Sequence, residues 1–380
     1  MSTDRRGQRR SSKPGGKPWF GITMVVFGSI LALTSGSAFV YTKSLFSTIE
    51  DSVPTENLLG GEEDPGADIE GPLNLLLLGN DHRENNDEGD KIGRTDTILM
   101  MHVNKDLTEA AVISVPRDLL VTIPDCGNGV ECESKVNDAY PLGGEAAAPG
   151  EELQGAVQNL AATLTDLTGI ETFDGAGLIK FDGFMELVKT FGTVELCIPF
   201  EMEVVHTDND KYELGPNGGR MIPKGCNEYT RGVALAIVRE RYAYGPHTPG
   251  WTEEWGMGDF GRQQMQQHFI KQLLKRAKDE GYMSDPTKVG PLVEAIGDQL
   301  LMDIGGRSVV DYAFALSGVD ISNMLTLRLP SESAEIDGTS YVVTQEGEQQ
   351  EQADALFEAM RNDTLDQWAT DNPEWTNNSA

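Results

Sequence analysis

The strongest constraint on this chain is a run without charged residues that begins at Trp19 and ends at Tyr41. A helix needs about 20 predominantly apolar residues to cross the hydrocarbon core of a bilayer, so the run is long enough. Trp19 and Tyr41 stand at its two ends, where aromatic rings favour the membrane interface. We therefore expect residues 19–41 to form a single transmembrane helix.

The segment before this run indicates its orientation. Residues 1–18 form a basic tail that carries Arg5, Arg6, Arg9, Arg10, Lys13 and Lys17. Basic flanks stay in the cytoplasm, so the N-terminus is expected to be cytoplasmic and the chain after Tyr41 to be extracellular. A cleaved signal peptide is the alternative, since small residues occur at 34–38, but its apolar part is usually only about 7–15 residues long. Both interpretations export the rest of the chain.

The charge of the chain restricts its partners. The formal net charge is −31, and because the N-terminal tail is basic, the exported part is more acidic still. Nucleic acid is excluded as a partner, since a phosphate backbone is bound by clustered Lys and Arg. Any anionic substrate must therefore meet a local group of arginines.

The domain pattern after the anchor is that of an α/β protein. Residues 42–71 are rich in Glu, Asp, Gly and Pro and predict an acidic flexible linker, which leaves 72–362 as the exported domain and 363–380 as a polar, frayed tail. The apolar run Leu73–Leu78 is typical of a buried strand. Further strands are expected at 97–103, 110–115, 176–181, 193–198, 325–329 and 340–343, with helices at 151–168, 183–191, 231–242, 260–280 and 349–361. This alternation predicts a three-layer-like α/β/α domain around a central mixed β-sheet.

Four cysteines in an exported domain favour disulfides. Cys126 and Cys132 flank a short turn, which leaves Cys197 and Cys226 as the second pair. A structural zinc site is the less favoured alternative, because the cysteine spacing is irregular and the five histidines are scattered.

Charged residues cluster where apolar elements end, and in open α/β sheets ligands bind beyond the strand ends. The four clusters are Asp81–Arg83, Arg94–Thr97, Pro116–Asp118, and Arg239–Arg241 together with Asp259–Gln264. Any one of them could be an ordinary surface ion pair. Four clusters, each next to an apolar element, favour one shared site.

The residue types in these clusters indicate a diphosphate ligand. Arginine binds phosphate in bidentate fashion. Asp81 and Asp96 suit Mg²⁺, with Mn²⁺ as the alternative ion, because this hard cation takes one or two carboxylates plus phosphate oxygens. Arg262 falls in the expected first turn of its helix, whose N-terminal end also favours an anion. The chain has no Walker loop, no G-x-G-x-x-G fingerprint and no G-x-S-x-G elbow.

A series of motifs in this order resembles the LytR-CpsA-Psr family over about Leu73 to Ala277. It consists of Leu-Leu-Gly-x-Asp81-x-Arg83, Arg94-Thr-Asp96-Thr97, Val115-Pro-Arg117-Asp118, Lys135-Val-Asn137-Asp-Ala-Tyr140, Gly143-Gly144, Phe191-Gly-x-Val194, Ala234-Leu-Ala-x-Val-Arg239-x-Arg241 and Asp259-x-x-Arg262-Gln-Gln264. The basic tail, single anchor and exported domain are the usual layout of this family. The resemblance implies a phosphotransferase of an actinobacterial type in the cell membrane. Such an enzyme moves a glycopolymer from a polyprenyl-pyrophosphate carrier to peptidoglycan.

The resemblance also implies residue roles. Asp81 and Asp96 match metal positions, and Arg117, Asp118, Asp259 and Arg262 match catalytic positions, with Asp118 and Asp259 as the two candidates for the general base. The pyrophosphate would be bound by Arg83, Arg94, Arg117, Arg239, Arg241 and Arg262, with Lys135, Asn137 and Gln263 around the same pocket. The lipid tail would occupy an apolar tunnel between the sheet and the helices.

One segment departs from the family pattern. Residues 243–258 are longer than the usual link and contain Trp251 and Trp255. This insertion could be a flap over the site, a binding surface for an acceptor glycan, or a plain surface loop. Two further functions stay open for the whole chain, namely a polyprenyl-pyrophosphate hydrolase and a non-catalytic wall-polymer binding or sensor protein.

Overall fold

The computed structural model describes residues 55–65, 68–80, 92–207, 209, 211–216, 218–240, 258–281 and 299–377. The expected tail and transmembrane helix at 1–41 lie outside the described residues, as do Asp81, Arg83, Arg241 and residues 243–257 of the insertion. In the described ranges, no helix is both long and apolar enough to span a bilayer. The chain divides into two compact units, Met1–Ser47 and Thr48–Ala380, and every described residue belongs to the second.

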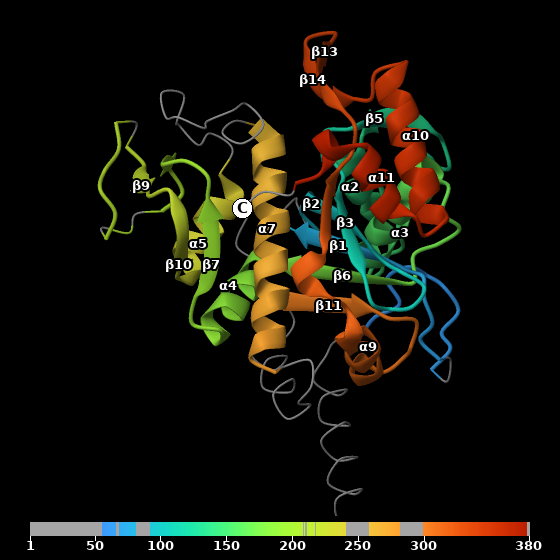
Figure 1. Cartoon of the computed structure of the whole chain (residues 1–380). Coiled ribbons are helices and arrows are strands. Elements are labelled where there is room, and N and C mark those ends of the chain that lie inside the picture. The colour runs from blue at the N-terminus through green and yellow to red at the C-terminus, as the bar shows by residue number, and fades with distance from the viewer. Residues whose placement is uncertain are drawn as a thin grey trace, which may run out of the picture. The chain divides into compact units, whose positions relative to one another are not determined.

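The centre of the described unit is a mixed sheet of six strands (Figure 1). Its order is β11 (Leu300–Asp303), β6 (Gly175–Lys180), β1 (Leu73–Asn80), β2 (Thr95–Val103), β3 (Ala110–Ser114) and β12 (Leu325–Arg328). β1 runs antiparallel to β2 and parallel to β6, while β12 runs parallel to β3. The expectation of a mixed α/β fold around a central sheet is therefore confirmed.

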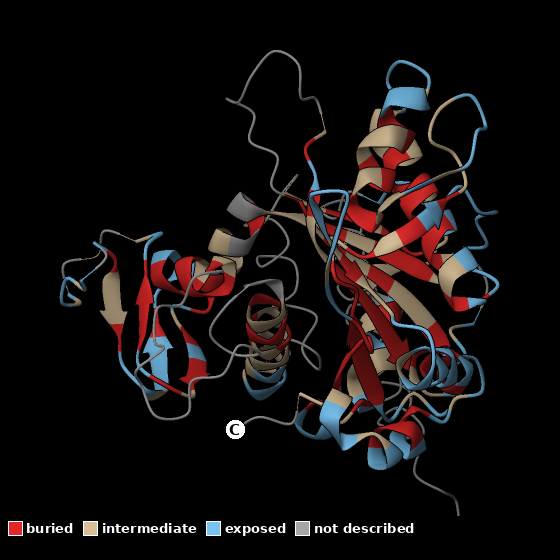
Figure 2. Cartoon of the chain, turned by 90° about the horizontal axis from the view of Figure 1, so that it is seen from above, coloured by how far each residue is buried: buried red, intermediate tan, exposed pale blue. Residues whose placement is uncertain are grey.

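The two faces of this sheet explain why β1 is apolar throughout. Leu76 and Leu78 belong to the core on one face, whereas Leu73 belongs to the core on the other, as expected from the alternation of side chains along a strand. Figure 2 shows the central strands buried along much of their length. A strand covered on both faces has no solvent-facing side on which polar residues could alternate.

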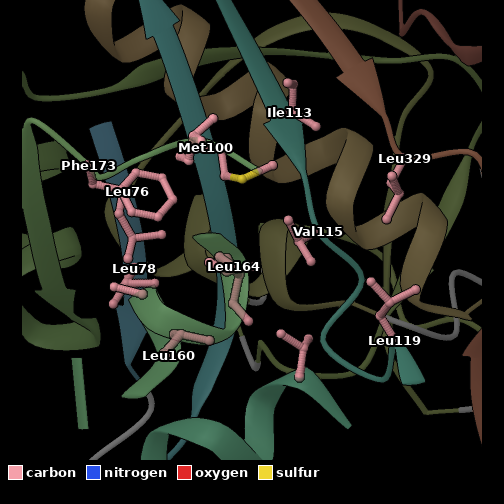
Figure 3. Packing of buried hydrophobic residues seen from close by; sticks show 14 of the residues in the cluster. Leu76, Leu78, Met100, Ile113, Val115, Leu119, Leu160, Leu164, Phe173 and Leu329 are labelled. Carbon is pink, nitrogen blue, oxygen red and sulfur yellow. The ribbon is translucent and has the colours of Figure 1, made fainter. Parts of the chain in front are cut away.

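The first face is covered by helices from both halves of the chain, namely α2 (Ala139–Ala146), α3 (Glu152–Thr168), α10 (Glu348–Arg361) and α11 (Leu365–Asp371). Figure 3 shows Leu160 and Leu164 of α3 beside Leu76 and Leu78 of β1. Leu160, Leu164 and Leu76 are fully buried, and each such leucine contributes about 1.5–3 kcal/mol of hydrophobic free energy.

The second face is covered mainly by α7 (Gly258–Asp279), α9 (Val309–Ala315) and the short helix η4 (Ile321–Asn323). The side chain of Gln267 ties α7 to the sheet, because its Nε2 donates to the carbonyl oxygens of Val112 and Leu327 at 3.4 and 2.6 Å. The other side of α7 buries Met265 and Phe269 in a separate core. α7 thus packs between two cores.

That separate core is built on a smaller strand pair. β7 (Val194–Ile198) pairs with β10 (Gly225–Tyr229), and α5 (Arg231–Arg239) and α4 (Phe181–Thr190) pack with them. A short second pair joins β8 (Met202–Val204) to β9 (Arg220–Ile222). α5 ends at Arg239 rather than at 242, and α7 begins at Gly258, so Arg262 lies in its second turn and not in its first.

The expected flexible linker is ordered in part. Thr55 forms a bridge to Met302, the Leu59 amide donates to Asp303 Oδ2 at 2.7 Å, and Leu58 is 1% exposed. The expectation of a linker too polar to pack is wrong for this stretch, because two adjacent leucines bury themselves against β11 and the first core. The folded domain therefore begins before residue 72.

The expected frayed tail is also ordered up to residue 377. Leu365, Trp368 and Ala369 of α11 are buried in the first core, and Trp375 packs against it. The Asn377 amide donates to the carbonyl oxygen of Thr326 at 2.7 Å. The apolar residues of this polar segment fall on one side of a short helix, which is enough to dock it.

Both expected cysteine pairs are bonded in the structure. Cys126 and Cys132 close the loop between β4 (Leu120–Ile123) and β5 (Cys132–Lys135). Cys197 and Cys226 stand directly opposite each other in the β7–β10 pair, with their Cα atoms 3.8 Å apart. Each disulfide therefore joins two adjoining strands or their loop.

Candidate functional site

The candidate site lies at one end of the central sheet. Because β2 is antiparallel to β1, Thr95 at its start pairs with Asn80 at the end of β1. β3 ends at the same end of the sheet, since Ser114 pairs with Leu99 of β2. β12 also ends there, with Arg328 opposite Ser114. The topology thus gathers the polar residues that follow or precede four strands.

Two arginines share one carboxylate at this edge. Arg117 Nη1 donates a hydrogen bond to Asp96 Oδ1. Arg262 Nη2 donates to the main-chain oxygen of Asp96 at 3.1 Å, and its Nη1 lies 3.9 Å from Asp96 Oδ2. The Arg262 side chain is 3% exposed, against 18% and 20% for Arg117 and Asp96. A buried cation is costly unless it is paired, so this arrangement is more than a surface ion pair.

Asp118 extends the same cluster. Its Oδ1 lies 2.9 Å from Lys135 Nζ, and its Oδ2 lies 3.4 Å from Arg117 Nε. The β4–β5 hairpin brings Lys135 there, because Lys135 at its end pairs with Leu120 at its start. The main-chain amide of Asn137 donates to the carbonyl oxygen of Arg117 at 3.1 Å. We call Asp96, Arg117, Asp118, Lys135 and Arg262 the Arg117 cluster.

Among the residues that the structure describes, the Arg117 cluster has more positive than negative groups. Three basic side chains, those of Arg117, Lys135 and Arg262, face two carboxylates, those of Asp96 and Asp118. In a strongly acidic chain such a local surplus is unusual, and it favours an anionic ligand.

Buried polar side chains surround the cluster. Thr95 and Ser114 are fully buried, and Asn137 and Gln264 are nearly so. The side-chain oxygen of each of these four residues has no hydrogen-bond partner in the part of the chain that the structure describes. Leaving such a group unsatisfied costs about 1–3 kcal/mol, a cost typical of sites that bind a ligand or water. Sequence reasoning missed Thr95 and Ser114, whose only signal is their position beside the Asp96 and Arg117 motifs.

Tyr140 connects the site to the helices of the first face. It is fully buried in α2, and burial raises its pKa above the usual value of 10, with the nearby Asn80 side chain acting in the opposite direction. The phenol therefore stays neutral. It lies near the end of β1, where the Asn80 side chain donates to the carbonyl oxygen of Ile92 at 2.8 Å.

The sequence and the fold were compared with those of known proteins. Residues 42–358 match the model of the LytR_cpsA_psr family. The chain belongs to that family.

Three relatives illustrate what this family member is similar to. Cell wall biosynthesis protein LcpA of Corynebacterium glutamicum is 25% identical over 87% of this chain, which spans 63% of LcpA. Polyisoprenyl-teichoic acid–peptidoglycan teichoic acid transferase TagU of Oceanobacillus iheyensis is 23% identical over 87% of this chain and 90% of TagU. TagT of Bacillus subtilis carries the corresponding TagT transferase name and is 24% identical over 81% of this chain and 84% of TagT.

Solved structures share the fold. B. subtilis TagV covers 78% of this chain and 98% of its own, with a TM-score of 0.56 and 19% identity. TagT bound to LI-WTA covers 80% of this chain and 94% of its own, with a TM-score of 0.51 and 21% identity. At these identities the likeness concerns the fold. The chain spans less than two thirds of the length of LcpA and LcpB of Corynebacterium glutamicum.

The structure also describes four other expected site residues of this LytR_cpsA_psr protein. Arg94 is exposed just before β2, and Arg239 ends α5. Gln263 is buried in α7 next to Arg262. Asp259 lies in α7, one turn before Gln263, with its side chain outside the described residues. In the described ranges no three His, Cys, Asp or Glu side chains are arranged to hold a metal ion.

Two positions near the edge were not expected from the sequence. The guanidinium of Arg328 lies 4.9 Å from the Trp375 ring centroid and 5.8 Å from that of Phe260, so it fastens the C-terminal segment and α7 to β12. Tyr341 presents its ring to Lys135 Nζ at 5.4 Å from the centroid. Neither residue stands in a charged motif, and a contact between segments so far apart has no signature in the sequence.

Proposed function

We propose that this protein is a phosphotransferase that joins a glycopolymer to peptidoglycan outside the cytoplasmic membrane. The donor is a polyprenyl-pyrophosphate-linked glycopolymer, and the product linkage is a phosphodiester. The observation that carries the proposal is the pair of arginines, Arg117 and Arg262, that share the carboxylate of Asp96. The transferase names of TagU and TagT support the reaction type.

The Arg117 cluster suits a diphosphate for reasons of charge. A diphosphate brings several negative oxygens, and Arg117, Lys135 and Arg262 supply donors from three different segments of the chain. Charge-assisted hydrogen bonds of this kind are strongest where water is excluded, and Arg262 is already buried. Arg83, Arg94, Arg239 and Arg241 are further proposed ligands of the diphosphate, with Gln263 and Asn137 as polar neighbours.

Asp96 fits a magnesium site at the same place. It offers the hard carboxylate oxygens that Mg²⁺ prefers, at the edge where the diphosphate would lie. We propose that Asp96 and Asp81 hold Mg²⁺, with Mn²⁺ as an alternative ion. When bound, the ion would neutralise charge on the phosphate oxygens.

In the proposed reaction a sugar hydroxyl of peptidoglycan attacks the phosphorus that carries the glycopolymer. A new phosphorus–oxygen bond forms, the phosphoanhydride bond breaks, and polyprenyl phosphate leaves with the bonding electron pair. Arg117 and Arg262 stabilise the charge that spreads over the phosphoryl oxygens. The hydroxyl proton passes to a carboxylate.

Asp118 and Asp259 are the two candidates for that carboxylate. Asp118 is already bound by Lys135 at 2.9 Å and Arg117 at 3.4 Å, so both of its carboxylate oxygens are engaged. We propose that Asp118 positions these two side chains, which leaves Asp259 as the general base.

The proposed location of the protein in the cell depends on the segment that precedes the folded domain. We propose that residues 19–41 anchor the protein in the cell membrane, with the N-terminus cytoplasmic and the catalytic domain extracellular. The anchor would confine the enzyme to the surface where a lipid-linked donor meets the wall, which raises their effective concentration.

The test uses the full chain in detergent with a short-chain polyprenyl-pyrophosphate glycan, peptidoglycan oligomers and Mg²⁺. Mass spectrometry should detect a phosphodiester-linked glycan on the oligomer, and EDTA should abolish it. Polyprenyl phosphate released without any acceptor would instead indicate a hydrolase. Donor binding without cleavage would indicate a binding or sensor protein.

A further inference from the structure

A two-stranded ribbon stands beside the Arg117 cluster. β13 (Glu332–Ile336) pairs with β14 (Thr339–Val343) through the turn Asp337–Gly338, whose two residues have φ of 52° and 79°. Figure 1 shows the turn of this ribbon projecting away from the central sheet. Most of its residues are exposed.

The base of the ribbon is fixed to the candidate site. The Val342 amide donates to the carbonyl oxygen of Asp118 at 2.8 Å, and Val342 forms a parallel bridge with Leu119. The Val342 side chain is buried in the first core. The ribbon is therefore held rigidly next to Asp118 at one end and is open at the other.

The register separates the two faces of the ribbon. Three cross-strand pairs share one face, opposite to that of Val342, namely Tyr341 with Ala334, Thr339 with Ile336, and Val343 with Glu332. Lys135 Nζ lies at the Tyr341 end of this face, and Ile336 is 39% exposed at the other. The face is a partly apolar strip that begins where the cationic cluster ends.

The charge of the ribbon indicates what can lie on it. Residues 332–343 contain Glu332, Glu335 and Asp337 and no Lys or Arg. A phosphate-bearing donor is repelled by these carboxylates and attracted to the Arg117 cluster. A hydrocarbon chain fits poorly beside the exposed Glu332 carboxylate and the Thr339 hydroxyl, which lie on the same face as Tyr341. A neutral, hydroxyl-rich glycan suits both the aromatic ring and the hydrogen-bonding groups.

We propose that the β13–β14 ribbon is the binding surface for the acceptor glycan strand, with Tyr341 as its central contact. The proposal rests on the proposed transferase function, whose acceptor it locates. Lys135 marks the border, since one side of its ammonium group faces Asp118 of the phosphate-binding cluster and another faces the Tyr341 ring. A sugar on Tyr341 is thereby placed next to the bound phosphorus.

The experiment measures initial rates of transfer with the donor and the peptidoglycan oligomer varied separately. Tyr341→Ala should raise the KM for the oligomer about tenfold, which corresponds to the loss of one aromatic contact, while the KM for the donor and kcat change by less than about twofold. Tyr341→Phe, which keeps the ring, should restore the parental KM. Leu214→Ser is the matched control, because Leu214 is an exposed apolar residue of another surface segment.

The other outcomes overturn the proposal. A higher KM for the donor with an unchanged KM for the oligomer would mean that Tyr341 only positions Lys135. Unchanged kcat and unchanged KM values for both substrates would mean that the ribbon does not take part in the reaction. Should the parental protein transfer nothing, calorimetry with the oligomer alone decides. Binding that Tyr341→Ala weakens about tenfold would keep the glycan surface and reject only the transferase, whereas no binding would reject the ribbon surface.

Discussion

At each end of the central sheet a buried basic side chain contacts an aspartate from a distant segment of the chain. The surroundings of the two contacts differ. At the site end Arg262 contacts Asp96, which also binds Arg117. At the other end His102 of β2 contacts Asn74 Oδ1 through Nδ1 at 2.8 Å and Asp363 Oδ1 through Nε2 at 2.9 Å. The second arrangement ties the segment after α10 to the sheet, and we call it the His102 clasp.

The difference lies in how completely the polar atoms are matched. In the His102 clasp one carboxylate oxygen of Asp363 contacts His102 and the other accepts from the Lys105 amide at 2.9 Å. In the Arg117 cluster the basic side chains outnumber the carboxylates, and the oxygens of Asn137 and Gln264 nearby have no partner among the described residues. A closed network stabilises the fold, while a network with surplus charge can bind an anion.

The largest effect is expected from Arg117→Ala. Transfer should fall by about 10³-fold or more, because a preorganised positive group at the reacting phosphate is lost. The thermal unfolding midpoint should stay within a few degrees, since the side chain is partly exposed. Arg231→Ala, which removes a surface ion pair with Glu186, is the matched control and should leave transfer unchanged. Equal transfer rates for Arg117→Ala and Arg231→Ala would mean that the Arg117 cluster matters no more to the reaction than a surface ion pair.

Asp118→Asn should have the second largest effect, a loss of about 10- to 100-fold in transfer. A neutral amide holds Lys135 and Arg117 less firmly than the carboxylate does. The rate should be followed against pH. An unchanged shape of the pH profile supports a positioning role, whereas loss of the limb that rises with pH would identify Asp118 as the general base.

Asp363→Asn should weaken the fold by about 2 kcal/mol and leave transfer at the parental rate under stabilising conditions. Asparagine tolerates the positive φ of 57° at this position, but its neutral amide replaces the charge-assisted contacts that the carboxylate makes with His102 and the Lys105 amide by weaker ones. Urea unfolding measures the change, with the exposed Asp106→Ala as control. A large loss of transfer in the folded variant would show that the His102 clasp also serves the reaction.

A smaller, pH-dependent effect is expected from a second histidine, which has no carboxylate partner among the residues that the structure describes. His268 Nε2 of α7 accepts from the Cys197 amide at 3.0 Å. Burial, and then the nearby charge of Lys271, lower the pKa of His268 from 6.5 to about 4. The folded state therefore holds the ring neutral while the unfolded state takes up a proton below pH 6.5. The resulting stability is fully present above pH 6.5 and is lost as the pH falls towards 4, by about 2 kcal/mol in order of magnitude.

Comparing His268→Gln with the parental protein separates the pH-dependent stability due to His268 from that due to the many carboxylates. The variant should lose about 2 kcal/mol less stability than the parental protein between pH 7 and 4.5. His206→Gln is the control, since His206 is exposed. Parallel stability curves for the parental protein and His268→Gln would reject the assignment.

The parts of the fold that the sequence predicts are those with a local signature. The apolar run of β1 predicts a buried strand because both faces of the sheet are covered. The 17-residue helix α3 and the disulfide loop at Cys126 are also local patterns. The ordered stretch at 55–64 has no such signature, because single buried leucines such as Leu58 leave no period in a polar segment. The same holds for Trp368 in the C-terminal segment.

The candidate site divides in the same way. The rule that ligands bind at strand ends brings together Asp96, which lies at the start of β2, and Arg117, which follows β3. The contact of Asp118 with Lys135 depends on the register of the β4–β5 hairpin, which the sequence does not specify. Tyr341 reaches Lys135 through a ribbon more than 200 residues further along the chain. Contacts of this kind come from topology rather than from any local motif.

The most direct test of the central claim is the affinity for a soluble diphosphate. Calorimetry with a short-chain polyprenyl diphosphate and Mg²⁺ would compare the parental protein, Arg117→Ala and Asp363→Asn at a temperature where all three are folded. We predict that Arg117→Ala weakens binding by about 100-fold, which corresponds to the loss of a charge-assisted contact, while Asp363→Asn binds as the parental protein does. Equal affinity of the parental protein and Arg117→Ala would contradict the account, because the shared carboxylate of Asp96 would then mark an ordinary ion pair.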